Sequence, residues 1–195
     1  EPLAALDAGT REQVRGELGE LLRAVALPTV LVSHDFEDAA ALAESVGILV
    51  DGRIVQTGSP AELVDDPRTA FVASFTGANV LGGHARAGAS SGTRVALDGG
   101  AAVEVADRAE GAVGVVVAPS SVAVAAEAGG GDGVNELEVN VLSAVPRGDR
   151  VRVTSSLLAA EIPADVASRV DLSPGAPIVM SFAATEARLV PLGDG

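Results

Sequence analysis

Apolar positions in residues 1–76 change from helical spacing to short unbroken runs. The helical spacing is seen at Val14, Leu18, Leu21, Leu22 and Val25. Thr10 and Gln13 form a capping-box pattern before these positions and Pro28 follows them, so the pattern predicts one helix between these limits. Thr29–Ser33 is a run without polar alternation, which is typical of a buried parallel strand, and His34 follows at its carboxyl end.

A second helix, a hairpin and two short helices are predicted next. Asp35 is a suitable N-cap for a helix that continues to about Ser45. The Asp51-Gly52 pair between two apolar runs predicts a type I′ hairpin turn. The segment Ser59-Pro60-Ala61-Glu62 is typical of a helix start, and a last short helix is expected over Thr69–Phe75. This alternation of helices and strands indicates an α/β domain.

After Gly77 the helical spacing nearly vanishes, and short alternating runs bounded by Gly, Asp or Pro replace it. These runs are TRVALDGG, AVEVA, VGVVVAP, VAVAA, ELEVNVLSAV, DRVRVTS and IVMSF. The glycine-rich stretch Gly129–Gly133 is expected to be a flexible loop, and Ala164–Val170 to form one short helix. Many short strands with glycine-rich turns predict a small all-β barrel or sandwich that starts near Ala78. The sequence shows no convincing internal repeat.

The composition limits both the core and the available chemistry. The chain has 195 residues, which allows two small units, and it contains 36 Ala and 29 Val but only 4 Phe and no Trp or Tyr. We therefore expect a core of small and β-branched side chains. The absence of Cys excludes disulfides, thiolate catalysis and Cys-ligated metals. The two histidines, His34 and His84, cannot form a His-rich metal site alone, so no metal site is predicted, and His84 is interpreted as an ordinary surface residue.

The charge excludes further classes of function. The net charge is −14, and all 13 basic residues are Arg, because the chain has no Lys. Schiff-base chemistry, pyridoxal phosphate anchoring and a P-loop lysine are therefore excluded. An acidic surface repels phosphate backbones, so no nucleic-acid partner is expected. No apolar run approaches the ~20 residues of a membrane-spanning helix, and no secretory signal is visible. Because the chain begins Glu1-Pro2 and its only Met is Met180, we expect it not to be a complete reading frame.

Three motifs in order give the first half a specific resemblance. EPLAALDA at Glu1–Ala8, VLVSHD ending at Asp35, and DGRIVQTGSPAELVDDP at Asp51–Pro67 resemble the C-terminal part of an ABC-transporter ATPase subunit of the importer type. The β-rich half resembles the TOBE domain of such subunits, at GANVL, VAPSSVAV and ARLVP. The resemblance implies an α/β plus all-β protein. Residues 1–77 would be the C-terminal part of a RecA-like P-loop NTPase domain, and residues 78–195 a small OB-like β-barrel, the TOBE domain.

The resemblance also implies roles for individual residues. Glu1 matches the catalytic glutamate that polarises the attacking water, His34 the H-loop histidine that bonds the ATP γ-phosphate, and Asp7 the D-loop residue at the dimer interface. The cofactors would be ATP and Mg²⁺, bound mainly by motifs that this sequence lacks. These are the P-loop, Q-loop, signature and Walker B aspartate, so we expect no ATP hydrolysis by these 195 residues alone.

The resemblance further implies an assembly. The complete subunit would be an ATPase that forms a homodimer and drives transmembrane permease subunits from the cytoplasmic face of the membrane, as a peripheral protein. The transported solute stays open, because molybdate, sulfate, iron, polyamine and sugar importers share this layout.

Two alternative functions follow from the β-rich half. In the first it is a non-enzymatic module that senses an oxyanion, for which Arg147, Arg150 and Arg152 are the candidate ligands. Strand alternation weighs against this reading, because it places Arg150 and Arg152 on the face opposite Val151 and the core, where they balance charge. In the second alternative this half is a structural module for subunit contacts.

Overall fold

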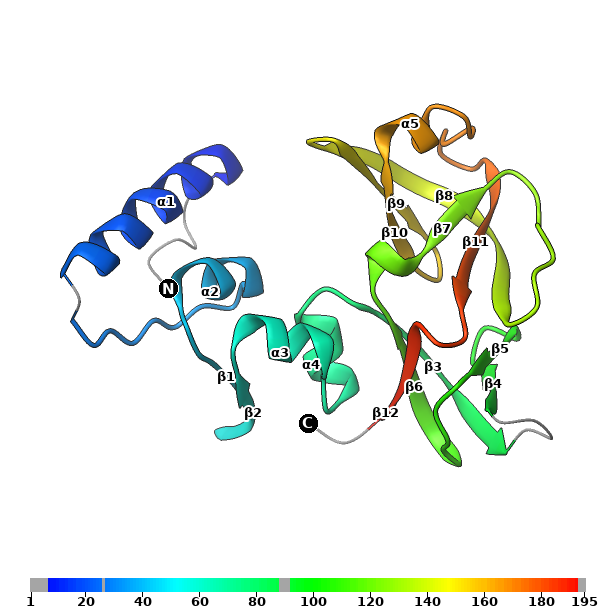
Figure 1. The fold of residues 1–195 in the computed structure, drawn as a ribbon, viewed down its shortest axis with the longest axis horizontal. Helices are drawn as coiled ribbons and strands as arrows, with labels where there is room; N and C mark the ends of the chain where they lie inside the picture. Colours follow the sequence, from blue (N-terminus) through cyan, green and yellow to red (C-terminus); the bar gives the residue numbers. More distant parts are fainter. Residues whose placement is uncertain (1–6, 26, 88–91, 193–195) are drawn as a thin grey trace. The chain divides into compact units, whose positions relative to one another are not determined.

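The computed structural model describes residues 7–25, 27–87 and 92–192, and the chain divides into two compact units (Figure 1). The first unit extends to Pro67 and the second runs from Arg68 to Asp194. The elements of the first unit are α1 (Ala8–Val25), α2 (Phe36–Leu42), β1 (Val46–Val50), β2 (Arg53–Gly58) and α3 (Pro60–Asp65).

Local sequence signals explain most of the first unit. Asp35 caps α2 by accepting hydrogen bonds from the backbone N–H groups of Glu37 and Asp38, as predicted, although the helix ends at Leu42 rather than near Ser45. Strands β1 and β2 form an antiparallel hairpin in which Val50 pairs with Arg53. Its two turn residues both have positive φ, 46° at Asp51 and 76° at Gly52, so the predicted type I′ turn is confirmed.

The predicted start of α3 is also confirmed. The Ser59 hydroxyl accepts from the Glu62 N–H at 3.3 Å, and the Glu62 carboxylate accepts from the Ser59 N–H at 2.8 Å. These two bonds form a complete capping box, with Pro60 in the first turn. Each bond satisfies a backbone donor that the helix itself cannot, which explains why so short a helix forms here.

Two predictions for the first unit are wrong. Thr10 does not cap α1, because the helix begins at Ala8 and Thr10 lies inside its first turn. Thr29–Ser33 is not a buried strand: it has no regular secondary structure, and the side chains of Val30 and Val32 are 93% and 66% exposed. The single sheet in the described part of this unit is the β1–β2 hairpin. A run that suits a parallel strand stays extended and exposed when the described chain gives it no strand to pair with.

The second unit is mostly β-structure, as predicted. Its elements are α4 (Ala70–Phe75), β3 (Asn79–Ala87), β4 (Thr93–Leu97), β5 (Ala102–Val105), β6 (Gly111–Val117), a 3₁₀ turn η1 (Pro119–Ser121), β7 (Ala123–Ala125), β8 (Val134–Arg147), β9 (Arg150–Ser155), β10 (Ala159–Pro163), α5 (Ala164–Ala167), β11 (Pro177–Ala183) and β12 (Ala187–Pro191). The short helix expected over Ala164–Val170 is confirmed as α5, although it ends at Ala167. The strands β3, β10 and β12 were not among the predicted runs.

These strands form two five-stranded antiparallel sheets with the orders β12-β6-β3-β4-β5 and β7-β11-β8-β9-β10. Each sheet curls so that its two edge strands approach each other (Figure 1). The two orders are identical when β3–β7 are matched in sequence with β8–β12. The unit therefore has the topology of a structural duplication, although its sequence shows no convincing internal repeat.

The last strand of each repeat lies in the sheet of the other repeat. Strand β7 pairs with β11, and β12 pairs with β6. Each sheet is thus completed by a segment that is distant in the sequence. Backbone pairing of this kind requires only the alternation of inward and outward side chains, and it does not require similar residues in the two halves.

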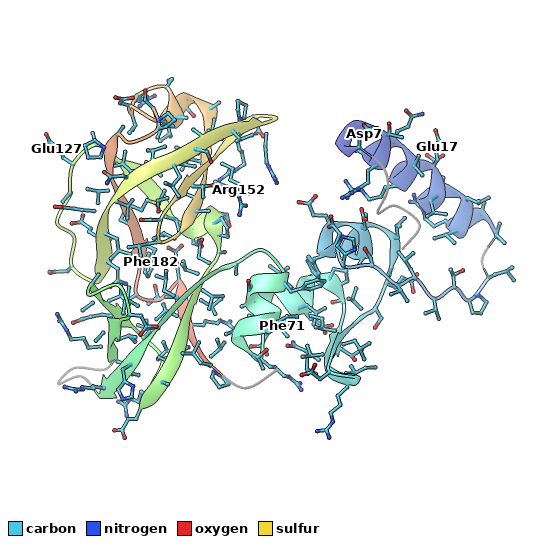
Figure 2. The ribbon with its side chains drawn as sticks, turned by 180° about the vertical axis from the view of Figure 1, so that it is seen from behind. Asp7, Glu17, Phe71, Glu127, Arg152 and Phe182 are labelled. Atoms are coloured by element: carbon cyan, nitrogen blue, oxygen red, sulfur yellow. The ribbon has the colours of Figure 1, made fainter. Side chains whose placement is uncertain are left out.

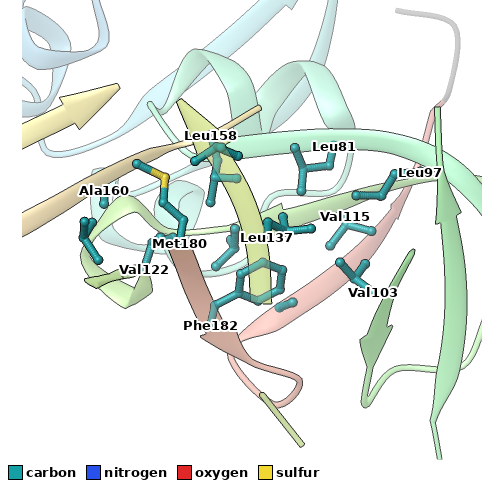
Figure 3. Packing of buried hydrophobic residues seen from close by; sticks show 14 of the residues in the cluster. Leu81, Leu97, Val103, Val115, Val122, Leu137, Leu158, Ala160, Met180 and Phe182 are labelled. Atoms are coloured by element: carbon teal, nitrogen blue, oxygen red, sulfur yellow. The ribbon is translucent and has the colours of Figure 1, made fainter. Parts of the chain in front are cut away.

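The two sheets share one hydrophobic core. Leu81, Val103 and Val115 of one sheet lie in the same cluster as Leu137 and Phe182 of the other (Figure 3). Half of the buried members of this cluster are valine, and Phe182 is its one aromatic residue among the described positions. The core is thus built of small and β-branched side chains, as the composition predicts.

Helix α4 packs on the second unit through a smaller cluster. Ala73 of α4 is fully buried beside Val116 of β6 and Val190 of β12. The Thr69 hydroxyl caps the helix by accepting from the Val72 N–H at 3.3 Å, and the predicted helix over Thr69–Phe75 is confirmed. The first strand of the sheet follows this helix after a short turn.

Candidate functional site

Asp7 caps helix α1 and is one of the residues that the sequence motifs single out (Figure 2). Its Oδ1 accepts from the Thr10 N–H at 3.0 Å, and its carbonyl accepts from the Arg11 N–H at 2.8 Å. The backbone N–H of Thr10, followed by its hydroxyl, lowers the pKa of the exposed Asp7 carboxyl. The D-loop aspartate of the resemblance is therefore held as a carboxylate at the start of a helix. Glu1, the candidate catalytic glutamate, lies outside the described residues.

His34 lies between two residues that are fixed by hydrogen bonds. The Asp35 N–H donates to the Ser33 hydroxyl at 3.1 Å, which closes a turn around the histidine. The Asp35 Oδ1 accepts from the Glu37 N–H at 2.8 Å and so attaches this turn to helix α2. His34 itself is exposed. The arrangement presents an imidazole to solvent from a short, hydrogen-bonded loop directly before a helix.

Three ion pairs join α1 to α2 and its N-cap, and sequence reasoning missed all of them. Arg11 Nη1 lies 3.4 Å from Asp35 Oδ2, and Arg15 Nη1 lies 3.2 Å from Asp38 Oδ1. The longest is Arg15 Nη1 to Glu37 Oε2, at 4.0 Å. Asp38 is buried, with 3% of its surface exposed, so its charge requires the guanidinium of Arg15. The signal was present in the spacing, because arginines four apart and aspartates three apart each lie on one helix face.

The same helix interface continues to Gly19, which is buried. A Cβ placed on Gly19 would lie 3.5 Å from Leu42 Cδ2, so the two helices approach closely there. Going along α1 from Arg11 to Gly19, the partners advance from Asp35, the N-cap of α2, to Leu42, its last residue. The two helices therefore run in the same direction. Asp7 and His34 precede these two parallel helices, each at the N-terminal end.

The arginine cluster of the β-rich unit is engaged by the protein itself. Arg152 Nη1 donates to Glu161 Oε1 at 2.9 Å, across the β9–β10 pair. Arg150 donates to the backbone carbonyl of the same Glu161. The Arg152–Glu161 ion pair agrees with the prediction that these arginines balance charge, whereas Arg150 contacts a neutral carbonyl. An oxyanion at Arg152 would have to displace the Glu161 carboxylate, which already lies within hydrogen-bond distance of it.

The β-rich unit also has an open hollow of about 470 Å³, lined by residues 126–128, 138–140 and 177–179. Glu127 (Figure 2) and Glu138 contribute carboxylates to it. This charge is unfavourable for an anion.

Within the described residues, no group of three His, Asp or Glu side chains is arranged to hold a metal ion. No described helix is both long and apolar enough to cross a membrane. His84 is exposed on β3, as expected for a surface histidine.

The chain resembles import ATP-binding proteins in sequence. It is 44% identical over 108 residues to the sulfate/thiosulfate import ATP-binding protein CysA of Caulobacter vibrioides, which covers 52% of this chain and 32% of that protein. It is 44% identical over 77 residues to the Fe(3+) ions import ATP-binding protein FbpC 2 of Rhizobium meliloti, covering 40% and 20%. It is 40% identical over 85 residues to the spermidine/putrescine import ATP-binding protein PotA of Ureaplasma parvum, covering 43% and 16%.

The alignments thus span a third or less of the length of these relatives. No family model matches the chain. Among solved structures, the cytoplasmic molybdate-binding protein ModG matches with a TM-score of 0.51 and 21% identity, covering 58% of this chain and 96% of that one. At this identity the likeness concerns the fold alone. The chain is therefore partly homologous to the ATP-binding subunits of ABC importers, and it contains a β-rich region with the TOBE-like fold of ModG.

Proposed function

We propose that this chain is part of the ATP-binding subunit of an ABC importer and supplies the water-activating side of its ATP site. The observation that carries the proposal is the identity of 40–49% to import ATP-binding proteins for several different solutes. Three motifs in the expected order support it: Glu1–Ala8, the VLVSHD run that ends at Asp35, and Asp51–Pro67. In this proposal residues 1–77 belong to the RecA-like ATPase domain and residues 78–195 to the TOBE domain.

The proposed chemistry is phosphoryl transfer to water. Glu1 would polarise the attacking water, and His34 would hydrogen-bond the γ-phosphate. Asp7 would contact the nucleotide site of a second copy in the dimer. The chain has no lysine and no glycine-rich phosphate loop, so ATP and Mg²⁺ would be held by another part of the complete subunit. That subunit would act on transmembrane permease partners at the cytoplasmic face of the membrane.

Substitutions in the complete subunit test this proposal. Glu1→Gln and His34→Ala should each reduce ATP hydrolysis at least ~10²-fold, because both remove groups that act on the attacking water and γ-phosphate. ATP binding should change little, since affinity comes mainly from the phosphate loop and Mg²⁺. His84→Ala is the matched control, because His84 is the chain's other histidine and lies on β3. Turnover of Glu1→Gln within about twofold of wild type would contradict the proposal.

The 195-residue chain alone offers a second test. It should show no ATP hydrolysis above buffer, because it lacks a phosphate cradle and a metal-binding aspartate. Hydrolysis by the purified chain that His34→Ala abolishes would show that the site has been assigned wrongly.

An oxyanion-sensing role for the β-rich unit is the second candidate, and the ModG-like fold is the observation that favours it. The contacts of Arg150 and Arg152 with Glu161 weigh against it. Isothermal titration with molybdate, tungstate and sulfate distinguishes the two. We expect no saturable heat from any of the three anions. Saturable binding that Arg152→Gln removes would favour the sensing role.

A further inference from the structure

Arg11 links the two loops that carry Asp7 and His34. Its backbone N–H donates to the Asp7 carbonyl at 2.8 Å, in the first turn of α1. Its guanidinium reaches Asp35, the residue after His34, at 3.4 Å. One residue therefore contacts the D-loop aspartate through its backbone and the histidine loop through its side chain. Nothing in the sequence motifs assigns a role to it.

Asp35 is well suited to transmit this link to His34. Its Oδ1 caps α2 through Glu37, while its Oδ2 is the atom that faces Arg11. Its backbone N–H is also bonded to Ser33 on the other side of the histidine. Asp35 therefore joins the turn that carries His34 both to α2 and to Arg11. The Arg11 and Asp35 side chains are 28% and 31% exposed, so water screens the pair only partly.

We propose that Arg11 and Asp35 are positioning residues that set the orientation of His34 relative to Asp7. The proposal rests on the proposed function, since it assigns these residues to the same ATP site. Phosphoryl transfer depends on placement of the reacting groups, and a misplacement of about 1 Å can reduce a rate ~10²-fold. The Arg11–Asp35 pair keeps the histidine loop at a fixed place beside the helix that Asp7 begins.

The neighbouring pair provides a control for a purely structural role. Arg15 pairs with Asp38, which is almost fully buried, whereas Asp35 is partly exposed. Arg15→Gln should therefore destabilise the α1–α2 interface more than Arg11→Gln does. Because the ion pairs of Arg15 are with Glu37 and Asp38 inside α2, and not with the turn that carries His34, Arg15→Gln should affect hydrolysis less. A positioning role therefore predicts that Arg15→Gln has the lower melting temperature and Arg11→Gln the lower kcat.

The first experiment measures turnover in the complete subunit. Arg11→Gln and Asp35→Asn should each lower kcat between about 5-fold and 100-fold, with KM for ATP within about twofold of wild type. Asp35→Asn keeps the Oδ1 acceptor for the α2 cap and removes the charge that faces Arg11. The double variant should be no slower than the slower single variant, and Arg11→Lys should recover part of the rate. Arg23→Gln, which removes a hydrogen bond within α1 to the Gly19 carbonyl and leaves the His34 turn untouched, should not change kcat. The proposal would be overturned if one of the two variants, Arg11→Gln or Arg15→Gln, had both the lower melting temperature and the lower kcat.

The second experiment uses the 195-residue chain and does not depend on hydrolysis. With isotopically labelled histidine the chain gives imidazole signals from His34 and His84 only. Arg11→Gln should shift or broaden the His34 signal and leave that of His84 unchanged, whereas Arg23→Gln should change neither. An unchanged His34 signal in Arg11→Gln would refute the positioning role. A wild-type complete subunit without ATPase activity would instead refute the proposed function, and the spectra would still decide whether Arg11 positions His34.

Discussion

Asn79 and Asn135 make the same contact in opposite directions between the two sheets. Asn79 of β3 donates to the carbonyl of Ala159 at 2.8 Å and accepts from its N–H at 2.6 Å. Asn135 of β8 donates to the carbonyl of Glu104 at 2.8 Å and accepts from its N–H at 2.7 Å. Ala159 lies in β10 and Glu104 in β5. Each asparagine amide therefore provides hydrogen-bond partners for a backbone N–H and C=O on the edge strand of the opposite sheet.

Loss of either amide should destabilise the β-rich unit. Asn79→Ala leaves the buried N–H and C=O of Ala159 without partners, and we expect about 2–4 kcal/mol of lost stability. Asn135→Ala should cost about 1–2 kcal/mol, because its contacts with Glu104 are only partly buried. Asn140→Ala, at an exposed position of the same strand β8, should change stability by less than about 0.5 kcal/mol.

Urea unfolding followed by far-UV circular dichroism measures these differences, since the chain has no Trp or Tyr for intrinsic fluorescence. Equal stability of Asn79→Ala and Asn140→Ala would show that the link between the sheets is not an important source of stability.

The duplication behind this symmetry could not be predicted from the sequence, although most of the strands could. Alternating apolar residues such as Val95 and Val153 identify strands, because a half-buried strand requires only this alternation. The pairing of β7 with β11 depends on which distant segments meet, and no local pattern contains that information. Local signals with a mechanism, such as the Ser59–Glu62 capping box, were predicted correctly for the opposite reason, since both partners lie within one turn.

Two glycines of the first unit should respond in opposite ways to the same substitution. Gly52→Ala should destabilise the hairpin by about 1 kcal/mol, because φ is +76° there and an L side chain strains that conformation. Gly16→Ala should stabilise α1 by about 0.5–1 kcal/mol, because Gly16 lies in the exposed middle of a helix and a Cβ there meets no atom within 4 Å. Thermal melts monitored by circular dichroism test both. A destabilising Gly16→Ala would contradict the helix as described.

The capping box of α3 should make that helix sensitive to acid. Hydrogen bonds from the Ser59 backbone N–H, and then from its hydroxyl, lower the pKa of the Glu62 carboxyl from its ordinary 4.5. A lowered pKa in the folded state means that the carboxylate stabilises the helix above pH 4.5, and that this contribution is lost as the pH falls through the folded value.

Carbon-13 titration of the Glu62 carboxyl should therefore give a midpoint below 4.5 in the wild type. Ser59→Ala should move this midpoint upward, because it removes the hydroxyl donor, while Ser74→Ala, at an exposed site in α4, should not. A midpoint unaffected by Ser59→Ala would mean that the box does not form in solution.

A fragment of residues 68–192 should be more stable than one of residues 78–192. Helix α4 buries Val72 and Ala73, and Ala73 packs against the β6 and β12 side chains of Val116 and Val190. Its removal exposes these apolar surfaces, which should lower the melting temperature by several degrees. Differential scanning calorimetry compares the two fragments. Identical melting temperatures would show that the helix adds no stability. The Ala73→Ser variant of the longer fragment should lie between them.

The candidate site was predictable only in its separate residues. Asp7 and His34 were found because they belong to short motifs, and the α2 cap was found because Asp35 directly precedes its helix. The pairs made by Arg11 and Arg15 were missed, because each joins residues more than twenty positions apart. The prediction of a strand at Thr29–Ser33 was wrong for a related reason. An apolar run shows that a segment could form a buried strand, but it does not show whether a neighbouring strand is present to pair with it.

The exchanged strands β7 and β12 make the β-rich unit independent of the continuity of its chain. Protease cleavage in the exposed Gly129–Gly133 stretch would separate the two repeats covalently. The N-terminal piece would still hold β7 in the sheet of the C-terminal piece, and the C-terminal piece would hold β12 in the sheet of the N-terminal one. Neither piece can depart without opening an edge of both sheets and their shared core. The two repeats therefore resemble the two subunits of a dimer with exchanged strands. Strand pairing and the shared core would hold them together without the loop that joins them.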